Sequence, residues 1–267
     1  MGRFYTNYSM FTGPREPDSD NLIECQTPDM SSNGVALLCK LYPKSARKSE
    51  RVLELLGRGA REYYRKPEAH CSTWCYFTPS SPKTNDDLVI AGLEVYDRRS
   101  ALQAQVDDPE YFQAYHQAVK AEDLYAKGEE LVAWYQTSGF LAREQHSIPF
   151  GGCLVFLTKL ICKDRDEVLK LLDDFVPFVR AQEPEILTYA LFTRPKAPKE
   201  VLLFGRCIDE KAAHAHSVTS QHTAVVEKLV KLVENDLATS TSMWHEVDDS
   251  FVSNKAGGTQ VLKDSRL

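Results

Sequence analysis

Hydrophobic and polar residues alternate along this chain in two ways, and each way predicts a different kind of element. Short runs rich in β-branched and aromatic residues, such as ILTYALFT at 186–193 and EVLLFGRC at 200–207, are typical of strands. Apolar residues spaced three and four apart, beginning with VLELL at 52–56, predict helices. The expected strands are 35–44, 70–79, 87–97, 129–137, 153–163, 186–193, 200–207 and 240–248, and the expected helices are 45–66, 100–126, 164–182 and 209–235.

The order of these elements, strand–helix–strand–strand–helix–strand, occurs twice. A shift of 111 positions sets Glu94 over Gly205 and Gln105 over His216, and VLELL at 52–56 resembles VLKLL further along the chain. This internal repeat predicts two domains of the same fold, over 35–145 and 146–248. Residues 1–34 are expected to form a polar extension, and residues 249–267 a flexible tail.

Each half therefore predicts a ferredoxin-like βαββαβ unit, which is a four-stranded antiparallel sheet with two helices on one face. The other face of such a sheet is apolar and must be covered, and two such sheets commonly cover each other. Because both units lie in one chain, we expect an α+β fold in which the two tandem units form an intramolecular barrel. Pockets are expected between each sheet and its own helices or inside the barrel.

Composition narrows the class of protein. With 43% hydrophobic and 26% charged residues, the 267-residue chain has the balance of an ordinary globular protein. Its net charge of −6 gives no electrostatic reason to bind nucleic acid, and no apolar run approaches the roughly 20 residues that span a bilayer. Seven cysteines, an odd number scattered through the expected strands, suit reduced thiols of an intracellular protein. We expect neither nucleic acid nor membrane as a partner, and a homodimer stays open.

Five segments carry a resemblance to a known family. In the second half they are EPEILTYALF at 183–192, PKAPKEVLLFGR at 195–206 and DEKAAHAH at 209–216, and in the first half LEVYDRRSALQAQ at 93–105 and EYFQAYHQAV at 110–119. These segments resemble the antibiotic biosynthesis monooxygenase domain of the dimeric α/β-barrel superfamily, over about residues 35–248. The family includes cofactor-free oxygenases of aromatic polyketides, haem-degrading relatives and autoinducer-processing proteins, so the motifs indicate the fold better than the reaction.

The resemblance implies a monooxygenase that needs no cofactor and acts with O₂ on an aromatic or polyketide-type small molecule in secondary metabolism. Such a substrate is deprotonated and then reduces O₂ itself, so the protein supplies a base, a dry aromatic cavity and hydrogen-bond donors. The glutamate usual in the family's third strand is present as Glu94 and replaced by Gly205, whereas the helix histidine is present as His216 and replaced by Gln105. The expected catalytic residues are His216, His222 and Glu94. The expected substrate-binding residues are Trp74, Tyr76, Tyr96, Trp134, Tyr189, Phe204 and His214.

Each candidate has a purely structural alternative. His216 is also explained as a helix-start residue bonded to the backbone, and His116 in the first half is better explained as a surface or packing residue. Aromatic strand residues are more often core than pocket. A metal site built from His214, His216 and His222 lacks a fourth ligand, and residues two apart on a helix do not face each other. We therefore expect no metal or other cofactor, although missing nucleotide-binding motifs do not decide about flavin.

A second class of function stays open beside the enzyme. Because each half has lost one residue of the Glu–His pair, the protein is also explained as a non-catalytic barrel that binds a hydrophobic ligand or a partner protein. Glu94 would then serve as an ion-pair partner of Arg98 or Arg99 rather than in chemistry.

The last three residues predict a cellular address. The segment KAGGTQVLKDSRL at 255–267 is polar and ends in Ser265-Arg266-Leu267, which resembles the SKL-type peroxisomal signal with Arg in place of Lys. We expect the peroxisomal import receptor as a partner and the peroxisomal matrix, otherwise the cytoplasm, as the location.

Overall fold

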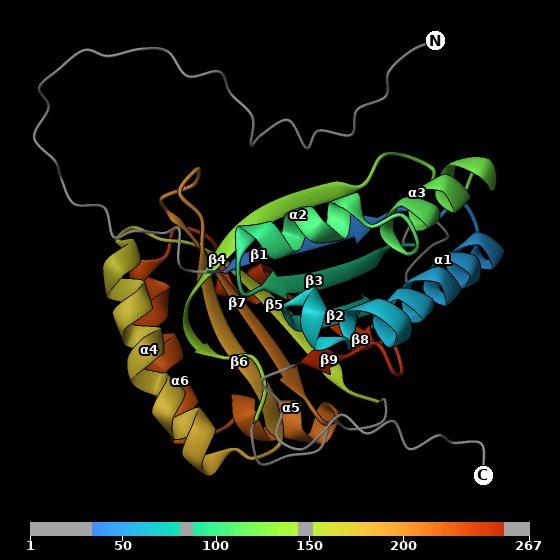
Figure 1. The fold of residues 1–267 in the computed structure, drawn as a ribbon. Coiled ribbons are helices and arrows are strands. Elements are labelled where there is room, and N and C mark those ends of the chain that lie inside the picture. The colour runs from blue at the N-terminus through green and yellow to red at the C-terminus, as the bar shows by residue number, and fades with distance from the viewer. Residues whose placement is uncertain (1–33, 81–87, 144–151, 254–267) are drawn as a thin grey trace, which may run out of the picture. The chain divides into compact units, whose positions relative to one another are not determined.

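The structure is a computed structural model that describes residues 34–80, 88–143 and 152–253 of the chain. The first half contains β1 (Val35–Leu41), α1 (Ala46–Gly59), the π-helical turn η2 (Ala60–Tyr64), the 3-10 turn η3 (Pro67–Ala69), β2 (Cys71–Pro79), β3 (Ile90–Tyr96), α2 (Arg99–Asp107), α3 (Phe112–Ala121) and β4 (Glu130–Phe140). The second half contains β5 (Leu154–Ile161), α4 (Arg165–Gln182), β6 (Ile186–Thr193), β7 (Glu200–Cys207), α5 (Glu210–Ser217), α6 (Ser220–Leu232), α7 (Leu237–Ser240), β8 (Thr241–Glu246) and β9 (Val252–Ser253). Both halves follow the βαββαβ order that the sequence pattern predicts (Figure 1).

Within the described residues, eight strands close into a ring. They pair in the order β3-β1-β4-β6-β7-β5-β8-β2, and β2 pairs back onto β3. Each half contributes four neighbouring strands, and the halves join where β4 pairs with β6 and where β2 pairs with β8, both antiparallel. The predicted α+β fold, with two tandem ferredoxin-like units forming an intramolecular dimeric α/β barrel, is confirmed.

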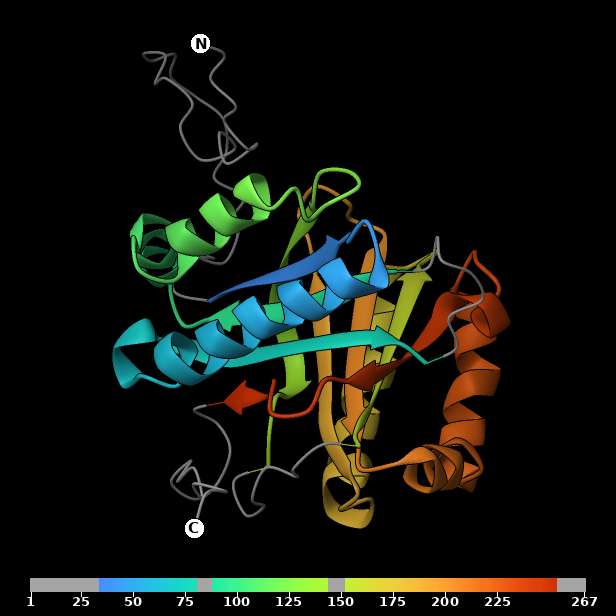
Figure 2. The same ribbon diagram turned by 90° about the vertical axis from the view of Figure 1, so that its right-hand side faces the viewer.

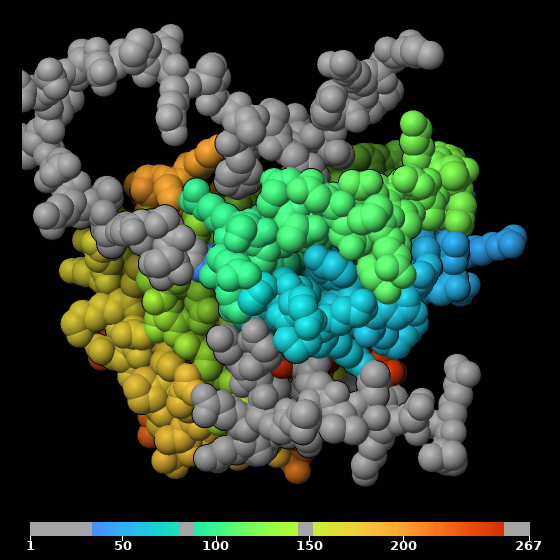
Figure 3. Space-filling model, viewed as in Figure 1, coloured from blue at the N-terminus to red at the C-terminus, as the bar shows by residue number. Residues whose placement is uncertain are grey.

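The helices lie outside the ring of strands. Helices α1, α2 and α3 run along the strands of the first half, whereas α4 and α6 lie beside those of the second half (Figures 1 and 2). In the space-filling view, the first-half helices (blue to green) and α4 (yellow) occupy separate areas of the surface (Figure 3). The helices in the described part of the chain are too short or too polar for any of them to cross a bilayer.

The inner faces of the two sheets share one hydrophobic cluster, which closes the barrel core. Trp134 and Phe204 belong to this cluster and are only 2% and 0% exposed. Trp134 pairs with Ala36 of β1, and Phe204 pairs with Ala190 of β6, so a small residue lies beside each large ring. The structure thus places these two expected substrate-binding residues in the packed core of the barrel.

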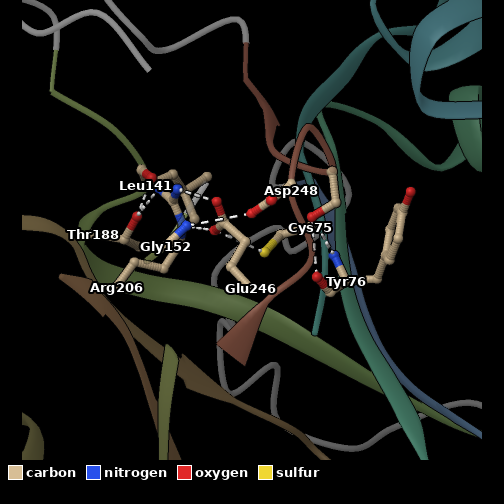
Figure 4. A network of polar contacts seen from close by, with 9 residues as sticks. Cys75, Tyr76, Leu141, Gly152, Thr188, Arg206, Glu246 and Asp248 are labelled. Carbon is tan, nitrogen blue, oxygen red and sulfur yellow. Dashed lines mark hydrogen bonds and ion pairs between the residues drawn. The ribbon is translucent and has the colours of Figure 1, made fainter. Parts of the chain in front are cut away.

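A buried ion pair lies among the strands of the same core (Figure 4). Arg206 of β7 donates to both carboxylate oxygens of Glu246 of β8, at 2.5 and 3.0 Å, and both side chains are 2% exposed. The guanidinium also lies 3.4 Å from Thr188 Oγ1, and the Cys75 thiol from the first half donates to Glu246 at 3.4 Å. Because a buried charge without its partner is costly, this network fixes β8 against β7 and β2.

Part of the expected flexible tail is ordered. Phe251 and Val252 are 4% and 2% exposed, and β9 pairs with β2 through Val252 opposite Trp74. Phe251 also covers the guanidinium of Arg206, whose central carbon lies 3.4 Å from the ring centroid. The address Ser265-Arg266-Leu267 and residues 1–33 of the expected extension lie outside the described residues, and these expectations, like the domain bounds, stay predictions.

Candidate functional site

His216 lies between the sheet and the helices of the second half. It belongs to α5, is 8% exposed, and is surrounded by rings from three other elements. The ring centroids of Phe156 (β5), Phe175 (α4) and Tyr189 (β6) lie 6.1, 6.0 and 5.9 Å from that of the imidazole. All three belong to the hydrophobic cluster between this sheet and its helices. The imidazole is therefore held in a largely apolar setting, where electrostatic interactions are stronger than in water.

Glu183 contacts the buried imidazole directly. Its Oε2 lies 2.6 Å from Nδ1 of His216, and the two side chains are 10% and 9% exposed. An ionised carboxylate only accepts hydrogen bonds, so its donor here would be a protonated Nδ1, which would leave Nε2 as the nitrogen that can exchange a proton. The other oxygen, Oε1 of Glu183, is buried and has no hydrogen-bond partner among the described residues.

A turn between α5 and α6 brings the second histidine to the first. Helix α5 ends at Ser217, and Thr219 is the N-cap of α6. The Thr219 hydroxyl donates to the carbonyl of His216 at 3.1 Å and accepts the backbone N–H of His222 at 3.1 Å. The imidazole centroids of His216 and His222 are consequently 4.7 Å apart. Burial and the nearby His216 lower the pKa of His222, so its neutral form is favoured.

Gly205 occupies, in the sheet of the second half, the position that Glu94 occupies in the sheet of the first. In the register, Gly205 pairs with Phe156 and Tyr189, just as Glu94 of the first half pairs with Leu37 and Trp74. A Cβ added at Gly205 would overlap three carbons of the Phe156 ring, and the farthest of them would be only 2.5 Å away. The ring of Phe156 therefore fills the space in which a side chain at position 205 would begin.

In the first half, Glu94 keeps the strand carboxyl on the helix side of the sheet. The Tyr96 hydroxyl donates to its Oε2 at 2.7 Å, and the Gln105 amide reaches the same oxygen at 3.5 Å. Burial raises the pKa of the Glu94 carboxyl to about 7. The two hydrogen bonds lower this pKa, but their effect is smaller than that of burial. Gln105 takes the place of His216 and also donates to the Tyr64 hydroxyl.

Aromatic side chains continue this first-half group. Tyr64 of η2 stacks on Trp74 with ring centroids 3.7 Å apart, and Tyr76 meets Trp74 edge to face at 6.4 Å. Trp74, Tyr76 and Tyr96 are 6%, 3% and 0% exposed. The indole N–H of Trp74 and Oε1 of Gln105 are buried and lack hydrogen-bond partners among the described residues. Of the expected substrate-binding residues, Tyr96 thus contacts Glu94, Trp74 pairs with it across the strands, and Tyr76 lies beside Trp74.

The remaining candidates lie elsewhere. His214 is exposed on α5, although it is two residues from His216. His116 of α3 is half-buried against Phe112, with ring centroids 4.4 Å apart, and burial lowers the pKa of His116. In the part of the chain that the structure describes, no group of three or more His, Cys, Asp or Glu side chains is arranged to hold a metal ion.

The structure brings three of the expected site residues together, Tyr189, His216 and His222, and adds Glu183 and Phe175, which sequence reasoning does not single out. Glu183 lies within the EPE segment of the resemblance, yet nothing in its neighbours distinguishes it from an ordinary polar residue after a helix. Phe175 reads as one of several apolar residues on α4. A signal for Phe204 did exist: it precedes Gly205 in a strand, so its side chain must face the opposite side of the sheet.

The sequence and the structure were both compared with known proteins, and only the structure has matches. No protein-family model matches the sequence, and no curated protein matches it. A solved structure of a "putative monooxygenase" from Lactobacillus acidophilus NCFM matches with a TM-score of 0.65 and 14% identity, over 84% of this chain and 97% of that chain. A second "putative monooxygenase", from Fusobacterium nucleatum subsp. nucleatum ATCC 25586, matches with a TM-score of 0.64 and 12% identity, over 86% and 97% of the two chains.

A third structure, named an "anthrone oxidase-like protein", matches with a TM-score of 0.53 and 12% identity, over 85% of this chain and 96% of that chain. At such identities the likeness shows a common fold. The predicted resemblance to monooxygenase-type α/β barrels is therefore confirmed at the level of the fold. The chain shares, over most of its length, the fold of proteins that are named as monooxygenases.

Proposed function

We propose that the protein is a cofactor-independent monooxygenase that oxidises an electron-rich aromatic small molecule, with His216 as the base. The observation that carries this proposal is the buried imidazole of His216. Its Nδ1 contacts the carboxylate of Glu183, and aromatic rings surround it. A histidine can accept a proton near neutral pH, and an apolar site favours a flat aromatic ligand.

The chemistry follows from what such a substrate can do by itself. For an anthrone, Nε2 of His216 takes a proton from the ring CH₂, and the resulting carbanion transfers one electron to O₂. The carbon radical and superoxide combine into a C–O bond, and the peroxide takes up a proton. Loss of the second C–H proton then breaks the O–O bond, which leaves a carbonyl and one water. One CH₂ group and one O₂ thus give one C=O group and one H₂O.

The protein's part is to bind, hold protons and exclude water. Burial raises the pKa of Tyr189, so its hydroxyl stays protonated and can donate a hydrogen bond to an oxyanion of the substrate. The low pKa of His222 keeps a neutral ring beside His216, so no second positive charge opposes protonation of the base. Phe156 and Phe175 supply apolar surface for the substrate ring.

The choice of an anthrone as the first substrate to test comes from the name of one structural neighbour, the anthrone oxidase-like protein. The test is incubation of purified protein with 1,8-dihydroxyanthrone under ¹⁸O₂, with no added flavin or metal. We expect the anthraquinone to carry one ¹⁸O atom and one O₂ to be consumed for each product molecule. Product formed at the rate of the uncatalysed reaction would contradict the proposal.

A non-catalytic barrel is the second candidate, because each half lacks one residue of the Glu–His pair. Gly205 has no carboxyl, and Gln105 stands where the second half has His216. Such a barrel would bind 1,8-dihydroxyanthrone without consuming oxygen above the background rate. A place in secondary metabolism, peroxisomal import and a homodimer are further proposals.

A further inference from the structure

The second half has lost its strand carboxyl, but a carboxylate still lies at its histidine. A side chain at position 205 would have to displace the Phe156 ring, because that ring occupies the space where a Cβ would lie. Glu183, at the end of α4, instead places Oε2 at 2.6 Å from Nδ1 of His216. The carboxylate therefore comes from a different element in each half: from β3 in the first half and from the end of α4 in the second.

Arg143 holds the backbone that carries this carboxylate. Its guanidinium donates to the main-chain carbonyls of Val179 and Arg180 in the last turn of α4 and of Glu183 and Ile186 just after it, with N···O distances of 2.6 to 3.0 Å. The carbonyl of Glu183 itself is 2.7 Å away. The last turn is the negative end of the helix, where a cation is favoured, and the guanidinium adds to the backbone hydrogen bonds that Val179 and Glu183 already accept there. Glu183 consequently leaves α4 in a fixed direction.

Glu183 has the geometry of an orienting residue rather than of a surface ion pair. Both side chains are at least nine-tenths buried, which removes the competition with water that weakens exposed pairs. A carboxylate at Nδ1 selects the tautomer with a proton on Nδ1, and only that neutral tautomer leaves Nε2 free to accept a proton. The same carboxylate stabilises the imidazolium that forms when Nε2 takes a proton.

We propose that Glu183 is the positioning residue of His216. Glu183 takes the place of the missing strand carboxylate and holds the imidazole in the Nδ1–H tautomer, with Nε2 ready to accept a proton. This inference rests on the proposed function for its catalytic meaning, but the tautomer itself can be observed without any substrate. In the resting protein, the carboxylate therefore already defines which nitrogen is the base.

The test uses the full chain with ¹⁵N-labelled histidine side chains and long-range ¹H–¹⁵N spectra at pH 9, which report the tautomer of each ring. In the wild type, His216 should show the Nδ1–H pattern. In Glu183→Gln, the new amide can donate to Nδ1, so the Nε2–H pattern should appear. Glu185→Gln, an exposed residue two positions away, is the matched control and should leave the spectrum of His216 unchanged.

A second variant keeps the test decisive if Glu183→Gln is poorly folded. Glu183→Asp retains a carboxylate and should retain the Nδ1–H pattern, whereas Glu183→Ala should lose it. An unchanged His216 tautomer in both Gln and Ala variants would overturn the inference. With 1,8-dihydroxyanthrone, Glu183→Gln should lower kcat on the order of 10²- to 10⁴-fold with little change in KM.

The two proposals fail in different ways. If the wild type does not consume oxygen, the proposed function fails, while the tautomer spectra still show whether Glu183 orients His216. If the wild type is active and Glu183→Gln keeps its kcat, the positioning role is wrong and the monooxygenase proposal stands.

Discussion

The contact between Gly205 and Phe156 predicts that substitutions at these two positions have coupled effects on the free energy of unfolding. In Gly205→Ala, the new Cβ would lie within 2.5 Å of three carbons of the Phe156 ring, whereas real Cβ atoms essentially never come closer than 3.0 Å. The backbone of β7 is fixed by pairing with β5 on one side and β6 on the other, so the ring must move. Overpacking of this kind costs about 1–3 kcal/mol, and we expect the upper end.

Replacing the ring should relieve the clash. Phe156→Leu copies Leu37, the residue that faces Glu94 in the first half, and by itself should cost about 1–2 kcal/mol through lost packing. In the double variant the two changes should compensate, with a coupling free energy of about 2 kcal/mol relative to the sum of the single variants. Urea unfolding followed by circular dichroism gives the free energy of unfolding of the wild type, the two single variants and the double variant.

Gly128→Ala is the matched control, since a Cβ there meets nothing within 4 Å, and the change in unfolding free energy should stay within about 0.5 kcal/mol. Additivity of the two single variants to within about 0.5 kcal/mol would refute the reasoning. The Phe156 ring would then not be what keeps a side chain out of position 205.

Two other predictions follow from the structure, and a third follows from the sequence of the last residues. Arg206→Met should destabilise the fold by about 3–5 kcal/mol because it leaves Glu246 buried without its cation, and Arg206→Met combined with Glu246→Gln should recover part of that loss in urea unfolding. The pKa of Glu94 is raised in the folded state to about 7, so its stabilising contribution is complete below the unfolded value and is lost as pH rises through 7. Discounted for partial exposure, the wild type should lose about 1–2 kcal/mol relative to Glu94→Gln between pH 5 and pH 8. A fluorescent fusion ending in Ser265-Arg266-Leu267 should be punctate with peroxisomes, and removal of these three residues should leave it diffuse.

Each of these has an outcome that contradicts it. A double variant no more stable than Arg206→Met alone would show that the unpaired carboxylate is not the cause of the loss. An equal pH dependence of stability in the wild type and in Glu94→Gln would mean that this carboxyl does not titrate with a raised pKa. Punctate fluorescence after removal of the last three residues would place the address elsewhere.

The fold was accessible from the sequence because hydrophobic period and element order are local properties. The shift of 111 positions, read from weak similarity alone, places Glu94 and Gly205 at equivalent points of the two sheets, and the strand register confirms it. The long helical regions 100–126 and 209–235 are each interrupted. Asp108 accepts the N–H of Tyr111 between α2 and α3, and Thr219 begins α6. Such caps form from single side chains, which periodicity does not reveal.

The site was less accessible because its parts come together through tertiary packing. Glu183 and His216 are 33 positions apart, one just after α4 and the other on α5, so their contact depends on how the helices end over the sheet. Trp134 and Phe204 have the composition of pocket residues, but the alternation of side chains along a strand turns them into the barrel core. Composition therefore identifies candidate residues, while register and helix ends decide which of them meet.

The central claim is that His216 of the second half is the base of an oxygen-consuming reaction. Its most direct test is oxygen uptake with 1,8-dihydroxyanthrone, without flavin or metal, by the wild type, His216→Gln and His245→Gln. The last variant changes an exposed histidine on β8 of the same half. We predict that His245→Gln keeps the wild-type rate and that His216→Gln loses on the order of 10²-fold or more. Equal rates for His216→Gln and the wild type, or no uptake above background by the wild type, would contradict the claim.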